Sequence, residues 1–157
     1  MNYWLTENQC TGCAACANVC PKNAISMEPD DNGFIRPVIV QKLCINCGKC
    51  EKTCPVLHPV PQKDNTPTPT IYAAWSLDGN TRYNSTSGGV FSELCKGVYT
   101  RGGAVAGAVY DKNLMVRHTV TTDVESLAAI RQSKYIQSEI GNTFQQIKKL
   151  LTSGKEV

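Results

Sequence analysis

Cysteine is the residue type whose number and spacing set this sequence apart. Eight of the nine cysteines in 157 residues lie between positions 10 and 54. Residues 10–21 (CTGCAACANVCP) and 44–55 (CINCGKCEKTCP) superpose after a shift of 34 positions, so this segment is an internal duplication. Each copy has the form C-x2-C-x2-C-x3-C-P, which is the bacterial-type run of thiolate ligands for [4Fe-4S] clusters. The spacing therefore predicts two such clusters.

The ligands of each predicted cluster come from both copies. Three cysteines at a spacing of three residues let a tight loop wrap a cubane, and the backbone N–H groups of the loop can face its sulfurs. The fourth cysteine follows after roughly one turn of helix and serves the other cluster, and the proline behind it ends the helix. The predicted ligand sets are Cys10, Cys13, Cys16 and Cys54 for one cluster, and Cys44, Cys47, Cys50 and Cys20 for the other.

Zinc sites and disulfides are the alternatives to clusters. Zinc ribbons and fingers present separated C-x2–4-C pairs, without a third cysteine at the same step, so zinc fits this spacing poorly. A secreted disulfide scaffold needs an export signal, and residues 1–10 (MNYWLTENQC) contain neither a basic segment nor an apolar core. The sequence has no run of eighteen apolar residues, so we expect no membrane span. The expected location is the cytoplasm.

Short strands are expected to hold the two copies together. Apolar residues near Ile25 and from Phe34 to Val40 predict two strands, joined by a turn from Asp30 to Gly33. A further strand is expected at Tyr3–Leu5, so that each half contributes a strand and a short helix. In this arrangement residues 1–57 resemble a two-cluster bacterial ferredoxin domain, and all eight ligand positions match.

A proline-rich linker over residues 58–70 is expected to separate this domain from a second one. Cys95 is expected to pack in the core of the second domain as a small buried hydrophobe. The elements predicted there are a strand at 71–75, a helix starting near Val90, a hairpin of residues 104–111 and 114–121, a helix from Thr122-Asp123 to about Gln132, and a helix starting at Asn142 or Thr143.

Two polar segments of the second domain are candidate ligand contacts. Ser87, Gly88 and Gly89 precede a helix, where unpaired N–H groups and absent side chains let a phosphate approach closely. Residues 131–138 (RQSKYIQS) combine cations, hydroxyls, amides and an aromatic ring without a helical period. From the residues alone, the first segment is a weak signal, because such turns are common helix caps. For the second, a solvated loop is an equally good interpretation.

The order of these segments resembles the amino-terminal region of the family of coenzyme F420 hydrogenase/dehydrogenase beta subunits, over residues 71–157. Members carry a Ser-Gly-Gly turn and a Gly/Gln-Ser-Lys-Tyr element. The resemblance implies a flavin-binding α/β domain that uses FAD and coenzyme F420. The flavin contacts it implies are Ser87, Gly88, Gly89, Ser133, Lys134, Tyr135, Gln137 and Ser138. The family continues with a Gly-Thr-Pro-Cys-Gln element that this sequence lacks, so we expect a truncated domain and a fragment of a longer chain.

The expected fold class is α+β, with a two-cluster ferredoxin domain at 1–57, the linker at 58–70 and a truncated α/β domain at 71–157. The expected function is the passage of single electrons between a redox partner protein or subunit and a flavin oxidoreductase site. No catalytic residue is singled out. A non-catalytic ferredoxin-fused docking module is the alternative. The net charge of +3, spread over 16 basic and 13 acidic residues, gives no support for a nucleic-acid partner.

Overall fold

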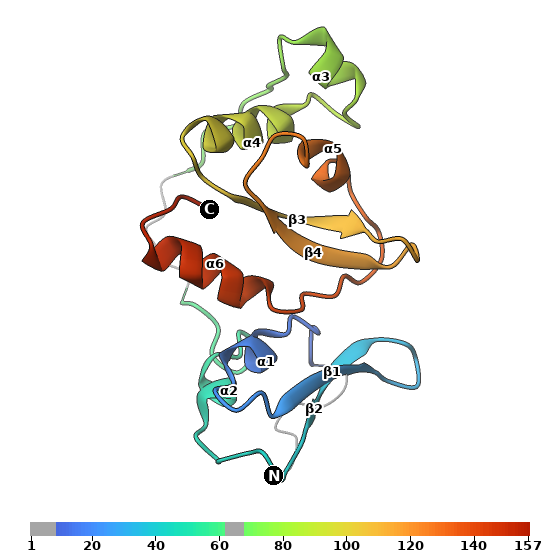
Figure 1. Cartoon of the computed structure of the whole chain (residues 1–157). Helices are drawn as coiled ribbons and strands as arrows, with labels where there is room; N and C mark the ends of the chain where they lie inside the picture. Colours follow the sequence, from blue (N-terminus) through green and yellow to red (C-terminus); the bar gives the residue numbers. More distant parts are fainter. Residues whose placement is uncertain (1–8, 62–67) are drawn as a thin grey trace. The chain divides into compact units, whose positions relative to one another are not determined.

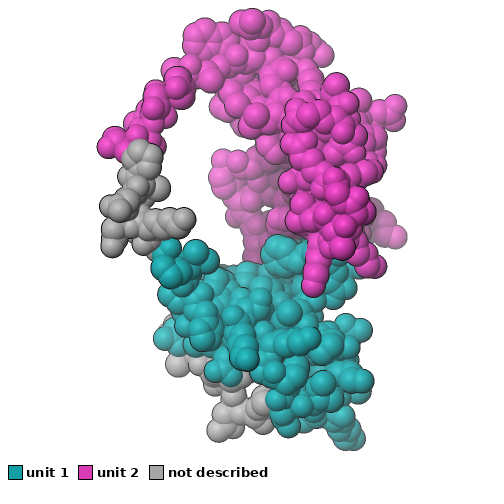
Figure 2. Space-filling view, turned by 90° about the vertical axis from the view of Figure 1, so that its left-hand side faces the viewer, with its two compact units in different colours: residues 1–62, 139–145 teal, residues 63–138, 146–157 magenta. Residues whose placement is uncertain are grey.

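The chain divides into two compact units, shown in different colours in Figure 2. The computed structural model describes residues 9–61 and 68–157. One unit comprises residues 1–62 and 139–145, and the other comprises residues 63–138 and 146–157. The described residues form short helices and two separate two-stranded sheets, which is the predicted α+β class (Figure 1). The strand expected at Tyr3–Leu5 lies outside the described residues.

The first unit contains the predicted hairpin. Strands β1 (Ile25–Pro29) and β2 (Ile35–Ile39) pair antiparallel, with Ile25 opposite Ile39. The turn between them is held by the Asp30 carboxylate, which accepts hydrogen bonds from the N–H groups of Asn32 and Phe34, both at 2.9 Å. This turn chemistry fixes the register of the two strands.

Each cysteine loop of the first unit leads into a short helix, α1 (Ala15–Val19) or α2 (Lys49–Lys52). The backbones of the two loops match as closely as their sequences do. Gly12 and Ala14 have left-handed φ angles of 67° and 56°, and their counterparts 34 positions later, Asn46 and Gly48, have φ angles of 54° and 70°. The duplication is therefore visible in the backbone conformation.

The second unit is built around a hairpin and the helices that cover it. Strands β3 and β4 pair antiparallel, with Val105 opposite Thr121, as predicted. Cys95 lies in the core with Val109, Leu127 and Ile130, as expected for a small buried hydrophobe. The elements are α3 (Gly79–Tyr83), α4 (Val90–Thr100), β3 (Val105–Tyr110), β4 (Val116–Thr121), α5 (Leu127–Ile130) and α6 (Thr143–Thr152), the last of which begins in residues grouped with the first unit.

Three expectations about the second unit differ from the structure. Residues 71–75 form no strand, since no described strand pairs with them. Helix α3 was not predicted, although Asp78 caps it by accepting hydrogen bonds from the N–H groups of Asn80 and Thr81. Helix α5 is shorter than expected and ends before Gln132, whose φ of 70° is left-handed and incompatible with a continuing helix.

None of the described helices combines the length and the apolar character needed to cross a bilayer.

Candidate functional site

The eight cysteines of the duplicated motif line two separate hollows in the first unit. One hollow is lined by the first three cysteines of the first copy together with Cys54 of the second copy. The other is lined by the first three cysteines of the second copy together with Cys20 of the first. The structure thus brings together Cys10, Cys13, Cys16 and Cys54 in one place, and Cys20, Cys44, Cys47 and Cys50 in the other.

The arrangement of four thiols around each hollow indicates which kind of metal group the thiols can bind. In the described part of the chain, no group of three or more His, Cys, Asp or Glu side chains forms a site for a single metal ion. Four thiols around a hollow suit a cluster, in which each thiolate binds a different iron atom. The donor chemistry therefore fits a four-iron cluster in each hollow.

Backbone geometry supplies hydrogen bonds to two of these sulfurs. The N–H of Gly12 donates to Cys10 Sγ at 3.5 Å, and the N–H of Ala24 donates to Cys20 Sγ at 3.3 Å. Hydrogen bonds to ligand sulfurs stabilise their negative charge and tune the potential of a cluster. Both hollows contain such a bond, because Cys10 and Cys20 line different hollows.

Burial opposes ionisation of the thiols in the protein alone. Burial raises the pKa of Cys16 to about 11, and the neighbouring Cys13 and Cys10 add to the rise. Burial likewise raises the pKa of Cys50, with a further contribution from Cys20 of the other copy. A coordinating metal removes the thiol proton outright, so ligation would reverse both effects.

The two hollows differ in their surroundings. Beyond its cysteines, the first is lined mainly by apolar side chains such as Met27, Pro37 and Val56. The second is also lined by Lys22, Lys49 and Glu51. Cys54 is buried whereas Cys47 is exposed, so the second hollow has a predicted ligand at the surface.

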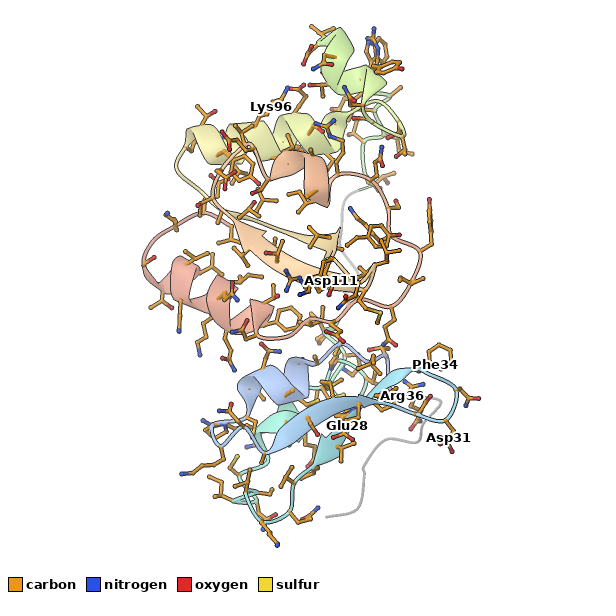
Figure 3. The ribbon with its side chains drawn as sticks, turned by 45° about the vertical axis from the view of Figure 1, so that its right-hand side comes forward. Glu28, Asp31, Phe34, Arg36, Lys96 and Asp111 are labelled. Atoms are coloured by element: carbon orange, nitrogen blue, oxygen red, sulfur yellow. The ribbon has the colours of Figure 1, made fainter. Side chains whose placement is uncertain are left out.

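Arg36 is a charged neighbour of the first hollow that sequence reasoning did not single out. Its guanidinium donates to the carbonyl of Cys10 and pairs with the Asp30 carboxylate at 3.1 Å. It also lies 5.4 Å from the centre of the Phe34 ring, and Figure 3 labels these two side chains on the hairpin. The hydrogen bond to Asp30 raises the pKa of Arg36, so its charge is permanent. The arginine therefore ties the cysteine loop to the hairpin and places a positive charge beside a predicted ligand.

Only some of the candidate flavin contacts of the second unit line the same cavity. A cavity of about 290 Å³ is lined by residues at the start of α4 and just after α5. Of the eight residues implied by the family resemblance, Ser87, Gly89 and Ser133 line it. The remaining five, Gly88, Lys134, Tyr135, Gln137 and Ser138, are not among its lining residues.

Several of those five residues are engaged within the protein. A Cβ atom added to Gly88 would lie 2.5 Å from the carbonyl oxygen of Ala74, so close backbone packing requires glycine there. Lys134 Nζ donates to the carbonyls of Ala129, Arg131 and Gln132 at 2.9, 2.7 and 3.1 Å, which caps the end of α5.

The last members of the segment lie in different surroundings. Ser138 Oγ is 2.8 Å from Nδ1 of His118, a half-buried residue of β4. Tyr135 is 93% exposed. The segment 133–138 thus combines internal contacts with an exposed aromatic ring. Only its first residue, Ser133, lines the cavity.

Comparisons with known proteins concern both units. Residues 9–57 match the 4Fe-4S dicluster domain family. Ferredoxin 7Fe of Hydrogenibacillus schlegelii is 43% identical over 58 residues, which are 36% of this chain and 67% of that protein. Electron transport protein HydN of Escherichia coli is 44% identical over 52 residues, covering 32% of this chain and 27% of HydN.

One relative extends the similarity beyond the cysteine motif. A component of the F(420)H(2) dehydrogenase of Methanosarcina mazei is 24% identical over 145 residues, covering 87% of this chain but 41% of that protein. The chain therefore spans less than half the length of this relative and of HydN.

Proposed function

The chain belongs to the ferredoxin family that carries a 4Fe-4S dicluster domain, and we propose that it passes single electrons from one protein partner to a flavin site through two clusters. Iron–sulfur electron transfer is the function shared by its relatives. The observation that carries the proposal is the grouping of the cysteines into two sets of four, each drawn from both copies.

The residues of the first unit would hold the clusters as follows. Cys10, Cys13, Cys16 and Cys54 bind one cluster, and Cys20, Cys44, Cys47 and Cys50 bind the other. When bound, such clusters supply one-electron chemistry. The N–H groups of Gly12 and Ala24 stabilise ligand sulfurs, and the crossed fourth ligands tie the two copies into one electron path.

We place the protein partner at the second hollow. Cys47 is exposed there, beside Ile45, which is 56% exposed. Lys22 and Lys49 line the same hollow, and Glu51 is the one carboxylate among its described lining residues. An apolar surface flanked by lysines is complementary to a partner that presents an acidic patch around its own redox centre.

The flavin part of the proposal concerns residues 71–157, with a linker at 58–70. We propose that they belong to the family of coenzyme F420 hydrogenase/dehydrogenase beta subunits and bind FAD, which exchanges hydride with coenzyme F420. The similarity to the Methanosarcina mazei protein over 145 residues supports this assignment, as does the cavity lined by Ser87, Gly89 and Ser133. A flavin accepts one or two electrons, so it can convert single electrons from the clusters into a hydride.

Iron and sulfide analysis of anaerobically prepared protein tests the cluster assignment. Two [4Fe-4S] clusters predict about eight iron and eight sulfide per chain, together with a cluster EPR signal after reduction by dithionite. Stoichiometric zinc without sulfide would overturn the assignment. The flavin part is tested separately by titrating the same protein with FAD, and intact clusters without flavin binding would favour the non-catalytic docking module.

A further inference from the structure

Two buried polar groups that line the cavity of the second unit have no hydrogen-bond partner among the described residues. Ser92 is 0% exposed, and its Oγ has no partner among the described residues. The Nε of Arg131 is also buried, and no described group accepts its hydrogen. Both residues line the 290 Å³ cavity. Buried polar groups are normally paired, so these two call for a partner that is not part of the protein.

The start of α4 adds further donors to this cavity. The first N–H groups of a helix have no partner within it, and they carry the positive end of its dipole. Gly89, the residue before α4, has a φ of 81° and offers no side-chain cap. Phe91 and Ser92 of the first turn both line the cavity. The helix therefore presents uncapped donors beside the orphaned hydroxyl.

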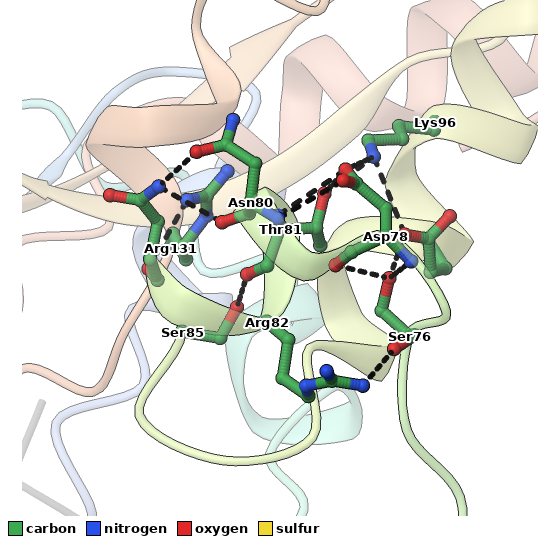
Figure 4. Close-up of polar contacts among 10 residues, drawn as sticks. Ser76, Asp78, Asn80, Thr81, Arg82, Ser85, Lys96 and Arg131 are labelled. Atoms are coloured by element: carbon green, nitrogen blue, oxygen red, sulfur yellow. Dashed lines mark hydrogen bonds and ion pairs between the residues drawn. The ribbon is translucent and has the colours of Figure 1, made fainter.

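Arg131 supplies positive charge to this cavity. Its Nη1 donates to the carbonyl of Asn84 at 3.1 Å (Figure 4), and no described carboxylate forms an ion pair with it. The carboxylate of α4 nearest its start, Glu93, is engaged with Ser76 and Lys96 at 2.6 and 3.3 Å and does not line the cavity. The cavity thus contains a cation and donors without a competing anion among the described residues.

We propose that this cavity binds an oxyanion of the phosphate class, held by the first turn of α4, the hydroxyl of Ser92 and the guanidinium of Arg131. Guanidinium groups match the geometry of phosphate oxygens, and charge-assisted hydrogen bonds are the strong ones. The site does not depend on the cluster assignment. It deepens the flavin part of the proposed function. Only the assignment of the oxyanion to the phosphate of a flavin rests on that part.

Calorimetric titration of the full, cluster-loaded chain with inorganic pyrophosphate tests the site at constant ionic strength, with chloride as the reference salt. Pyrophosphate is expected to bind, and Arg131→Gln is expected to weaken binding by roughly tenfold or more, because a charged hydrogen-bond donor is lost. Arg117→Gln is the matched control, since it removes the same charge from an exposed residue of β4 that does not line the cavity.

Ser92→Ala separates binding from a purely structural role. Removing a buried, unpaired hydroxyl is expected to raise the unfolding temperature without ligand, while pyrophosphate binding weakens. A structural hydroxyl would leave pyrophosphate binding unchanged. The proposal is overturned if pyrophosphate binds no better than chloride, or if the Arg117 and Arg131 variants weaken its binding equally.

Riboflavin and FMN distinguish the source of the oxyanion, since only FMN carries a phosphate. Tighter binding of FMN than of riboflavin, lost in Arg131→Gln, assigns the site to a flavin phosphate. If pyrophosphate binds but FMN binds no tighter than riboflavin, the site binds a free phosphate compound. That result supports the oxyanion site and contradicts its assignment to a flavin phosphate. Iron and sulfide contents, measured on the same samples, report the clusters independently.

Discussion

Gly88 is the residue at which packing and ligand binding are most easily confused. An added Cβ would lie 2.5 Å from Ala74 O and 3.0 Å from Trp75 Cα. Gly88→Ala is therefore expected to lower the free energy of unfolding by about 1–3 kcal/mol through overpacking, as measured by urea denaturation. Gly79→Ala is the control, because an added Cβ there meets no atom within 4 Å. Equal stability of the two variants would contradict the packing role.

Residue identity alone predicted some roles and missed others. Cys95 could be assigned to the core because it falls on the apolar face of a helix, and the structure confirms this. The hydroxyl of Ser92 could not be found in this way, because a serine in a first helical turn is common on solvated faces. Its lack of a partner is seen only in the folded structure, where Ser92 is fully buried and no described group bonds its hydroxyl. Gly88 and Lys134, which sequence reasoning offered as ligand contacts, make contacts within the protein.

In the proposed ligand sets, the fourth cysteine of each copy follows a short helix and binds the cluster of the other copy. Double variants can test this crossed ligation. Cys20→Ser combined with Cys44→Ser removes two ligands of one proposed cluster, so about four iron per chain are expected to remain. Cys20→Ser combined with Cys10→Ser removes one ligand from each cluster and is expected to leave far less iron. The reverse order of iron contents would show that each copy binds its own cluster.

At the scale of elements, local signals predicted the structure well where partners lie close in sequence. The hairpin of β1 and β2 follows from two apolar runs around the turn at Asp30, and that of β3 and β4 follows in the same way. The strand expected at 71–75 was wrong, because an apolar run forms a strand only where another strand pairs with it. Helix α5 starts later than expected, after a turn in which the Asp123 carboxylate accepts a hydrogen bond from the N–H of Ser126 at 2.9 Å. It ends before Gln132, whose φ is left-handed.

For the molecule as an electron carrier, we propose that the charges around the second hollow set the preferred partner. Changing both Lys22 and Lys49 to glutamate is expected to slow oxidation of the reduced protein by ferricyanide roughly threefold to tenfold at low salt, because electrostatic attraction to an anionic acceptor is lost. Stopped-flow absorbance measures the rate. The effect should fade as ionic strength rises.

A second double variant provides the control for this experiment. Changing Lys112 and Lys155 to glutamate alters the net charge by the same amount in the second unit. It is expected to leave the ferricyanide rate nearly unchanged. If both double variants slow the reaction equally, net charge rather than the lysines beside Cys47 governs the approach of the acceptor.

The matching φ angles of the two cysteine loops have a consequence for how the copies diverged after duplication. Four positions share a left-handed backbone, and glycine is present at Gly12 and Gly48 only. Asn46 is a residue that tolerates this conformation, whereas Ala14 is not. Ala14 is 4% exposed, so its methyl group gains burial that offsets the unfavourable backbone. Each loop has thus drifted in side chains around an inherited backbone, and the ancestral half is best reconstructed with glycine at both positions.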